Sequence, residues 1–292
     1  MCRIFGFRSV IQSQVHRSLV AADNALCVQS GQNPDGWGVA YYLEGAAHLL
    51  RSPEKALDDQ LFDRVSGVVA SETVLAHVRK ATVGNLSVLN CHPFQYGRWT
   101  FAHNGEVKHF DRHRQALRAE IAPRLRRYIL GDTDSEVIFF LFLTELSAYG
   151  GLGERYGAKE VAAALSAAVR CVRTITDGDA EEEKALLTLV VTDGQTMVAT
   201  QGGKELHYST YKNRCADRDS CPHLAPHCEA PTETGFVNHL LFSSEPTSGE
   251  AVWHAMKPGD IVGVDWRMRL FNSRVGEAAE HPRSEVPLPV VG

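Results

Sequence analysis

The chain has 292 residues, 44% of them hydrophobic and 22% charged, and carries a formal net charge of −5. This composition is typical of a globular protein, and the slightly acidic balance argues against nucleic acid or an anionic membrane as a partner. The longest apolar run, residues 137–143, is too short to span a bilayer. Seven cysteines in a chain of this length, with no signal-peptide pattern before the first expected strand, favour reduced thiols and a cytoplasmic location.

The spacing of apolar residues predicts alternating strands and helices in the first half of the chain. Strands are expected at 2–7, 38–43, 47–50, 74–78 and 99–102, and helices at 15–28, 55–65, 110–129, 133–148 and 157–176. The second half is mostly β, with strands expected at 186–192, 197–201, 206–208, 237–243, 261–264 and 268–271.

Strands at both ends of the chain, with helices between them, favour a single layered α+β domain over two separate ones. We expect this domain to span residues 1–280. Residues 281–292 are rich in proline and charge, which predicts an extended or disordered tail.

The second residue, Cys2, becomes the N-terminus if the initiator Met1 is removed. It then carries a thiol and a free α-amine, which together form a nucleophile with its own base. Reference pKa values of about 8.5 for a thiol and about 7.7–8.0 for an α-amine lie close to working pH. The alternative interpretation is that Cys2 is a small residue that opens a buried strand.

Four other stretches place polar residues near the expected ends of strands or helices, where side chains and backbone groups are free to meet a ligand. They are Asn-Pro-Asp-Gly-Trp-Gly at 33–38, His-Val-Arg-Lys-Ala-Thr-Val-Gly at 77–84, Phe-Ala-His-Asn-Gly-Glu at 101–106 and Gly-Asp-Thr-Asp-Ser-Glu at 131–136. Each has a simpler explanation when taken alone. These explanations are a tight turn, a surface ion pair, a hairpin turn and a helix cap, respectively.

The order and spacing of the five motifs together resemble the glutaminase domain of class-II glutamine amidotransferases, which are N-terminal-nucleophile hydrolases. The resemblance covers residues 2–140 motif by motif, and a weaker resemblance is found at 241–246. It implies a four-layer αββα sandwich, which the expected strands and helices can accommodate.

The family's catalytic roles carry over to this chain position by position. Cys2 resembles the nucleophile that attacks the side-chain amide of glutamine, and its α-amine resembles the general base. The Asn104 side-chain amide and the Gly105 backbone N–H resemble the oxyanion hole. Arg79 resembles the clamp on the substrate α-carboxylate, and Asp134 resembles the acceptor for the α-ammonium.

Three further residues are expected to take part in substrate binding. Thr82 would support the carboxylate end of the substrate, and Asp35 and Trp37 would shape the pocket wall. The resemblance implies no cofactor and no metal, and the substrate is glutamine or another small γ-glutamyl molecule.

The chain departs from classical members of the family in having no second catalytic domain that consumes the ammonia. No phosphate-cradling glycine-rich loop follows Asp134. The chain therefore looks like the stand-alone subfamily, similar to the γ-glutamyl hydrolase of ergothioneine synthesis. A synthase or a second copy of the chain is the expected kind of protein partner.

A second departure is the segment 215–228, which contains three cysteines and two histidines. Thiolates and imidazoles are preferred zinc ligands, but the segment lacks the tight Cys-x2-Cys hairpin of common structural zinc sites. The favoured interpretation is a long polar insertion near the site that acts as a lid.

Two other functions compete with amide hydrolysis. The first is a catalytically silent module that keeps the fold and binds a γ-glutamyl ligand or docks a synthase. The second is an N-terminal-nucleophile acylase that acts on a different amide. The presence of nucleophile, oxyanion donors and both clamp residues disfavours the first, and the Arg79 and Asp134 pair disfavours the second.

Overall fold

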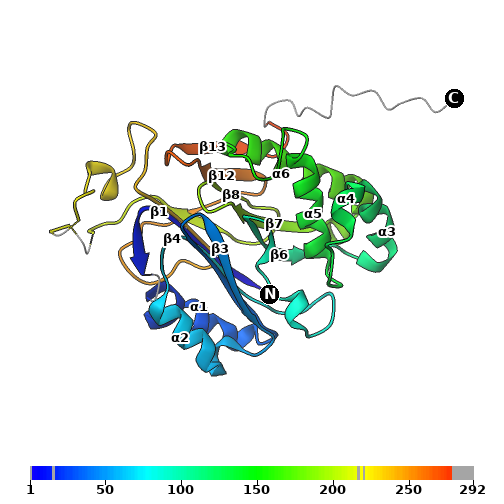
Figure 1. Cartoon of the computed structure of the whole chain (residues 1–292), viewed down its shortest axis with the longest axis horizontal. Helices are drawn as coiled ribbons and strands as arrows, with labels where there is room; N and C mark the ends of the chain where they lie inside the picture. Colours follow the sequence, from blue (N-terminus) through cyan, green and yellow to red (C-terminus); the bar gives the residue numbers. More distant parts are fainter. Residues whose placement is uncertain (1, 15–16, 216–217, 220, 278–292) are drawn as a thin grey trace.

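Two β-sheets lie against each other in the middle of the molecule, between two layers of helices (Figure 1). The computed structural model describes residues 2–14, 17–215, 218–219 and 221–277. Within these residues, seven strands form the first sheet in the order β11 (His254–Ala255), β9 (His207–Ser209), β10 (His239–Ser243), β1 (Arg3–Gln14), β4 (Ala70–Val78), β2 (Trp37–Leu43) and β3 (Ala46–Ser52). The second sheet, within the same residues, has six strands in the order β13 (Leu270–Arg274), β12 (Asp260–Val264), β8 (Met197–Thr200), β7 (Leu186–Thr192), β6 (Trp99–Glu106) and β5 (Phe94–Tyr96).

The two helical layers differ in size. Short helices lie on the seven-stranded sheet, namely α1 (Leu26–Gln29), α2 (Gln60–Val68) and a π-helical turn (Arg17–Ala21). Longer helices cover the six-stranded sheet, namely α3 (Phe110–Glu120), α4 (Pro123–Arg126), α5 (Asp134–Leu146) and α6 (Ala158–Thr176). Single 3-10 turns connect other elements at Ser30–Gln32, Ala56–Asp58, Val88–Asn90, Glu181–Glu183 and Pro226–Cys228.

Three hydrophobic cores correspond to the three interfaces between these four layers. The alternation of β1 shows how one strand serves two of them, because successive side chains of a strand point to opposite faces. Ile4 packs in the core between the sheets, whereas Phe5 and Phe7 pack toward α1 and α2. The predicted αββα sandwich is therefore confirmed, and Cys2 lies where β1 begins.

Helix α5 is the central element of the larger helical layer. Every residue from Asp134 to Leu146 is buried, because the helix packs against β6 on one side and against α3, α4 and α6 on the others. A helix that is hydrophobic all round is expected in such a position. The apolar run 137–143 thus belongs to a core helix, and the N-terminal end of α5 is held firmly in place.

The helix predicted over residues 15–28 is wrong. Strand β1 continues to Gln14, and only the π-helical turn and the four-residue α1 follow it. Asn24 explains part of the difference, because its side chain donates to the Pro246 carbonyl oxygen (2.5 Å) and accepts from the Ser248 N–H (2.7 Å). Such side-chain bonds to a distant loop compete with a continuous helix. Residues 15–16 lie outside the described residues.

The single helix predicted over residues 110–129 is also wrong, because the chain forms two helices there. Helix α3 ends at Glu120 and α4 begins at Pro123. Proline has no N–H and restricts the residue before it, so it is disfavoured inside a helix and favoured at a first turn. The sequence contains this signal at Pro123.

Strand β6 is longer than predicted, and this changes the setting of the Asn-Gly pair. The prediction ended the strand at residue 102 and placed the pair directly after it, whereas β6 extends to Glu106. Asn104 pairs with Thr188 and Gly105 with Leu187 of β7. Strand pairing over more than 80 positions of sequence has therefore overridden the local turn preference of Asn-Gly.

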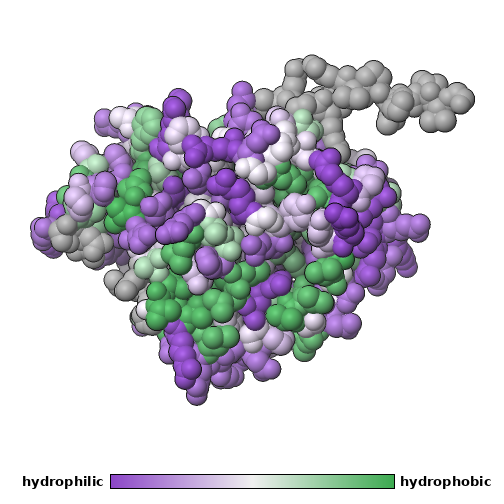
Figure 2. All heavy atoms as spheres, viewed as in Figure 1, coloured by the Kyte–Doolittle hydropathy of each residue, from purple (hydrophilic) through white to green (hydrophobic). Residues whose placement is uncertain are grey.

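The short strands β5 and β11 were not predicted, since two or three residues give no readable alternation. No helix in the described part of the chain is long and apolar enough to cross a membrane. The predicted boundary at residue 280 and the predicted tail at 281–292 lie outside the described residues. In the view of Figure 2, hydrophobic surface gathers over the end of the sandwich that carries α1 and α2. Leu57, Leu61 and Val68 are exposed hydrophobic residues in or next to α2.

Candidate active site

The thiol of Cys2 is buried at the start of β1, with 9% of the residue exposed. Its Sγ accepts a hydrogen bond from the Lys80 N–H (3.2 Å) and lies 3.4 Å from the Lys80 carbonyl oxygen, to which the thiol donates. Burial raises the pKa of this thiol, and the Lys80 N–H and the Arg79 guanidinium oppose that effect. The Asp134 carboxylate raises the pKa further. Both clamp candidates therefore act electrostatically on the Cys2 sulfur.

The pairing of β1 with β4 brings Arg79 to Cys2. Arg3 pairs with Val78, so the residues just beyond them, Cys2 and Arg79, lie at the same end of the two strands. The turn at 35–36 holds the backbone of Arg79, whose N–H donates to the Gly36 carbonyl oxygen (2.7 Å). Gly36 has φ +121°, and a Cβ there would lie 2.6 Å from the Cys91 sulfur. Glycine is therefore required at this turn.

The Arg79 side chain is 2% exposed and organises the loop that follows it. Its Nη2 donates to the Val83 carbonyl oxygen (2.9 Å), and its Nη1 donates to that of Asn85 (3.2 Å). A guanidinium has five N–H donors in a planar fork, so further donors remain for a ligand. Thr82 is exposed in the same loop. The loop and the guanidinium thus form one unit beside Cys2.

Asn104 approaches Cys2 through Ser244. The Ser244 hydroxyl lies 3.5 Å from Asn104 Nδ2 and accepts from the N–H of Ile4 (3.0 Å), two residues after Cys2. The Asn104 side chain is buried, and its Oδ1 has no hydrogen-bond partner in the described part of the chain. A Cβ at Gly105 would collide with the Leu186 carbonyl oxygen, so only glycine allows this close approach to β7.

Asp134 is the first residue of α5, and its carboxylate is 3% exposed. Its Oδ2 accepts from the Val107 N–H (2.7 Å) and its Oδ1 accepts from the Ser135 N–H (2.7 Å). A negative charge at a helix N-terminus is stabilised by the helix dipole. Thr133 caps the helix by accepting from the Glu136 N–H (3.2 Å), so Asp134 is free of the capping role.

A buried histidine, His103, connects the strand of Asn104 to the helix of Asp134. His103 Nε2 lies 2.8 Å from the Leu186 carbonyl oxygen, which can only accept, so Nε2 carries the hydrogen. In the neutral ring Nδ1 then accepts from the Ser135 hydroxyl (2.9 Å). This contact joins the strand that carries Asn104 to the helix that carries Asp134.

A cleft of about 700 Å³ lies beside these residues. Thr82, Asn85, Glu106, Lys108 and Asp132 are among the residues that line it. The lining is mainly polar and carries charges of both signs. The cleft is bordered by the loop that Arg79 holds and by the strand end that follows Gly105, so it adjoins the candidate site.

Thr82 is exposed in its loop, whereas Asp35 is bonded to the backbone and Trp37 is buried. Asp35 Oδ2 accepts from the Ala81 N–H (2.8 Å), so this carboxylate holds the chain just after Arg79. Trp37 has no exposed area, packs edge-to-face on Phe62 and donates from Nε1 to Asp59 (2.9 Å). The indole therefore belongs to the core beneath the turn and presents no surface to a ligand.

The sequence did not single out Lys80, His103, Ser135 or Ser244 as site residues. Lys80 acts through its backbone, which no side-chain pattern can reveal. His103 and Ser135 each lie next to a candidate site residue, and Ser244 lies in the stretch 241–246, where the resemblance is weaker. The positions next to the motif residues were therefore the signal that could have identified His103, Ser135 and Ser244. The roles assigned to the motif residues themselves stay predictions.

The described residues contain no group of three or more histidine, cysteine, aspartate or glutamate side chains placed to hold a metal ion. The described residues form no disulfide.

This chain is similar to several known proteins in sequence and in fold. The family of class-II glutamine amidotransferases matches residues 1–268. The "probable glutamine amidotransferase DUG3" of Saccharomyces cerevisiae is 33% identical over 198 residues, which are 61% of this chain and 56% of that protein. The chain thus aligns with about half the length of this yeast relative.

Two further relatives bear on the site and the fold. The "gamma-glutamyl-hercynylcysteine sulfoxide hydrolase" of Mycobacterium tuberculosis is 41% identical over 76 residues, 26% of this chain and 33% of that protein. The solved structure of a glutamine aminotransferase class-II domain protein from Silicibacter pomeroyi has a TM-score of 0.64 at 21% identity. That similarity covers 96% of this chain and all of that one.

Proposed function

Because the chain belongs to the class-II glutamine amidotransferases, we propose that it hydrolyses the side-chain amide of glutamine or of a γ-glutamyl amide through Cys2. The observation that carries the proposal is the convergence on one buried thiol of a cation, an anion and an amide side chain. The pairing of β1 with β4 brings Arg79 to the same strand end as Cys2, Asn104 reaches that end through Ser244, and the Asp134 carboxylate helps to raise the pKa of the Cys2 thiol. A fixed cation and anion select an amino-acid zwitterion as the head group of the substrate.

The nucleophile requires a nearby base. Burial raises the pKa of the Cys2 thiol, so the resting group is protonated at neutral pH and a thiolate must form during attack. Removal of Met1 supplies the base, because the freed α-amine of Cys2 takes the proton of its own thiol. The sulfur then attacks the γ-carbonyl carbon of the substrate and forms a tetrahedral intermediate.

The Asn104 amide and the Gly105 N–H stabilise the negative oxygen of this intermediate. The protonated α-amine gives its proton to the leaving nitrogen, the C–N bond breaks, and ammonia or an amine departs. A γ-glutamyl thioester on Cys2 remains. Water, deprotonated by the same α-amine, attacks the thioester and releases glutamate and the free thiol.

The substrate is held at its far end by the two clamp residues. The remaining N–H groups of Arg79 bind the α-carboxylate, and Asp134 accepts from the α-ammonium while its oxygens keep the bonds to Val107 and Ser135. Thr82 supports the carboxylate from the loop. Asp35 acts indirectly by fixing the chain after Arg79.

A γ-glutamyl amide larger than glutamine fits this account better than glutamine alone. The adjoining cleft of about 700 Å³ is as large as pockets that take drug-sized ligands. The named activity of the mycobacterial relative is on a γ-glutamyl compound. Release of amine from a panel of γ-glutamyl amides, compared with release of ammonia from glutamine, measures this preference.

A glutamine analogue with an electrophilic γ-carbon tests the proposed function directly. We expect it to alkylate Cys2 and to leave the other six cysteines unmodified, as read by peptide mass mapping. Arg79→Lys should slow the labelling. Labelling at another thiol, or labelling of Cys2 that glutamine does not compete with, would remove the support for a γ-glutamyl site. A protein that binds the analogue reversibly and forms no adduct would instead be the catalytically silent module.

A further inference from the structure

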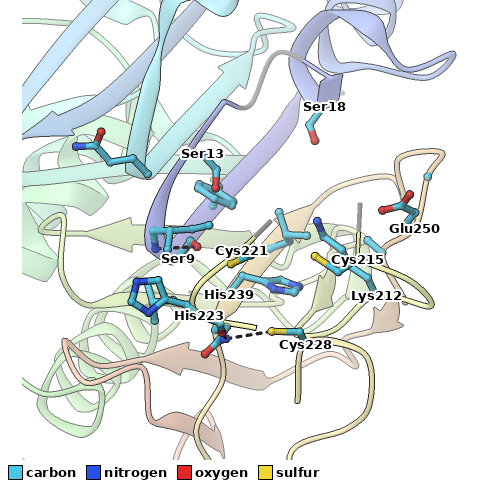
Figure 3. A pocket seen from close by; sticks show the side chains of 18 of the residues that line it. Ser9, Ser13, Ser18, Lys212, Cys215, Cys221, His223, Cys228, His239 and Glu250 are labelled. Carbon is cyan, nitrogen blue, oxygen red and sulfur yellow. Dashed lines mark hydrogen bonds between the residues drawn. The ribbon is translucent and has the colours of Figure 1, made fainter. Parts of the chain in front are cut away.

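A second cavity, of about 630 Å³, lies on the outer face of the seven-stranded sheet (Figure 3). Its floor contains Phe5 and Phe7 of β1 and Leu241 of β10, which pairs with Phe7. The cavity is also lined by residues 247–251 and by Lys212, Cys215, Cys221, Pro222, His223 and Cys228. Four of these residues, Cys215, Cys221, His223 and Cys228, belong to the segment 215–228 that the sequence suggested as a lid near the site, and the cavity they line is separate from the cleft beside Cys2.

The wall formed by the insertion is fixed to the sheet by hydrogen bonds. Asn238 donates from Nδ2 to the His223 carbonyl oxygen (2.6 Å) and to the Cys228 sulfur (3.0 Å). The Lys212 N–H donates to the Cys228 carbonyl oxygen (2.9 Å), and the Cys215 N–H donates to Glu229 (2.7 Å). These bonds tie both ends of the segment together, so the cavity is a formed feature of the fold.

The cavity contains a buried polar atom that has no partner. His239, in β10, is 9% exposed, and its Nε2 makes no hydrogen bond within the described residues. Burial lowers the pKa of this imidazole to about 4, so the ring is neutral at physiological pH. In Figure 3 the ring projects into the cavity among Cys215, Cys221 and Cys228. Leaving a buried polar group without a hydrogen bond costs free energy. This points to a ligand that forms a hydrogen bond with His239 Nε2.

Two opposite charges share the cavity with His239. Lys212 and Glu250 both line it, and neither forms an ion pair in the part of the chain that the structure describes. Their backbones are neighbours, because Lys212 bridges to Ala251 and the Asn213 N–H donates to the Glu250 carbonyl oxygen (2.8 Å). A cation, an anion and an unpaired imidazole nitrogen thus line one cavity above an apolar floor.

We propose that this cavity binds a free α-amino acid with an apolar side chain. The carboxylate accepts from His239 Nε2–H and from Lys212, and the ammonium donates to Glu250. The apolar side chain packs on Phe5 and Phe7. A purely apolar ligand would leave His239 unpaired, and a simple anion would face Glu250 without compensation. A metal ion is disfavoured because no three ligating side chains of the described residues are placed to hold one.

Isothermal titration calorimetry on the full chain tests the proposal, with L-phenylalanine and L-leucine as probes. The Cys2→Ala variant is used so that the catalytic thiol takes no part. We expect both amino acids to bind, and phenylacetate and phenethylamine, which each carry one charge, to bind more weakly. Binding that is equally strong for phenethylamine, or absent for both amino acids at millimolar concentration, overturns the proposal.

Two substitutions assign the binding to this cavity. Loss of one charged hydrogen bond should weaken binding about 10- to 100-fold in His239→Phe and in Lys212→Ala. Lys257→Ala, at an exposed lysine outside the cavity, is the control and should bind like the parent. Lys212 lies at the wall, so its variant remains informative if His239→Phe does not fold. Unchanged affinity in both variants, or binding that requires added Zn²⁺ and disappears with a chelator, contradicts an amino-acid site here.

Discussion

Two hollows of this molecule differ in how the charged or ring groups proposed to hold a ligand are satisfied. At the Cys2 end, Asp134 accepts two backbone N–H groups and Arg79 donates to carbonyls of its own loop. In the outer cavity, Nε2 of His239 has no partner within the described residues. The first arrangement is typical of a site whose charges are oriented before the substrate arrives. The second is typical of a site that a ligand must complete.

Strand β1 joins the two regions. Cys2 lies at its beginning, and Phe5 and Phe7 form the floor of the outer cavity. A substitution in one region therefore separates their functions only if it leaves this strand intact. The variants below are chosen on that basis, and each affects one region more than the other.

The largest effect is expected for Cys2→Ala, which removes the nucleophile. Hydrolysis of glutamine and of γ-glutamyl amides should fall by at least about 10⁴-fold, to background. Amino-acid binding in the outer cavity should be unchanged, since β1 keeps its pairing. Steady-state release of ammonia and calorimetry on the same preparation measure the two outcomes. Residual hydrolysis near the level of the parent would show that another group attacks the amide.

Asn104→Ala should lower kcat by about 10²–10³-fold, because one donor to the developing oxyanion is lost. KM should change little, since the clamp residues are untouched. Asn272→Ala, an exposed asparagine of β13, is the matched control and should behave like the parent. A rise in KM without a fall in kcat would place Asn104 in substrate binding and outside the oxyanion hole.

Arg79→Lys should lower kcat/KM by about 10- to 100-fold, mainly through KM, because an ammonium cannot reproduce the planar fork. The loop at 82–85 also loses its carbonyl contacts. Arg124→Lys on the exposed side of α4 is the control. If an amide without an α-carboxylate is hydrolysed equally by the parent and by Arg79→Lys, the arginine does not act on the carboxylate.

Acid should destabilise the fold by similar amounts through two buried histidines, His77, which pairs with Ile4 near the start of β1, and His239 of the outer cavity. Burial lowers the pKa of His77 to about 3 and that of His239 to about 4, so both rings stay neutral in the folded protein at pH 5. The unfolded chain, with histidine pKa values near 6.5, binds protons there. The free energy of unfolding therefore falls between about pH 7 and about pH 5, by about 2 kcal/mol for each ring.

Urea denaturation at the two pH values measures this loss. His77→Gln and His239→Gln should each reduce the difference by about 2 kcal/mol. A difference that stays the same in both variants would mean that neither ring is held neutral by the fold.

The sequence brought out the residues at the Cys2 end more fully than those of the outer cavity because the two are built differently. Arg79 and Asp134 stand at element ends with readable patterns, so their neighbourhood followed from motifs. The outer cavity combines Phe5, Lys212 and His239, which no short motif connects. Its unpaired imidazole depends on β1 pairing with β10, across more than 200 positions of sequence.

The errors in the predicted fold also come from contacts between residues that are far apart in the sequence. Asn104 and Gly105 were placed after a strand because Asn-Gly favours turns, and pairing with β7 kept them inside β6. The helix over 15–28 failed because Asn24 is bonded to a loop more than 220 residues away. The break at Pro123, by contrast, was readable from the sequence and follows from proline's missing N–H.

The central claim is that the N-terminal residue of the mature chain supplies both the attacking sulfur and its base. Intact-mass analysis combined with ammonia release tests it, on one preparation that has lost Met1 and one prepared so that Met1 is retained. The account predicts hydrolysis by the first preparation and none by the second, with the same fold in both. Equal turnover by the preparation that retains Met1 would contradict it.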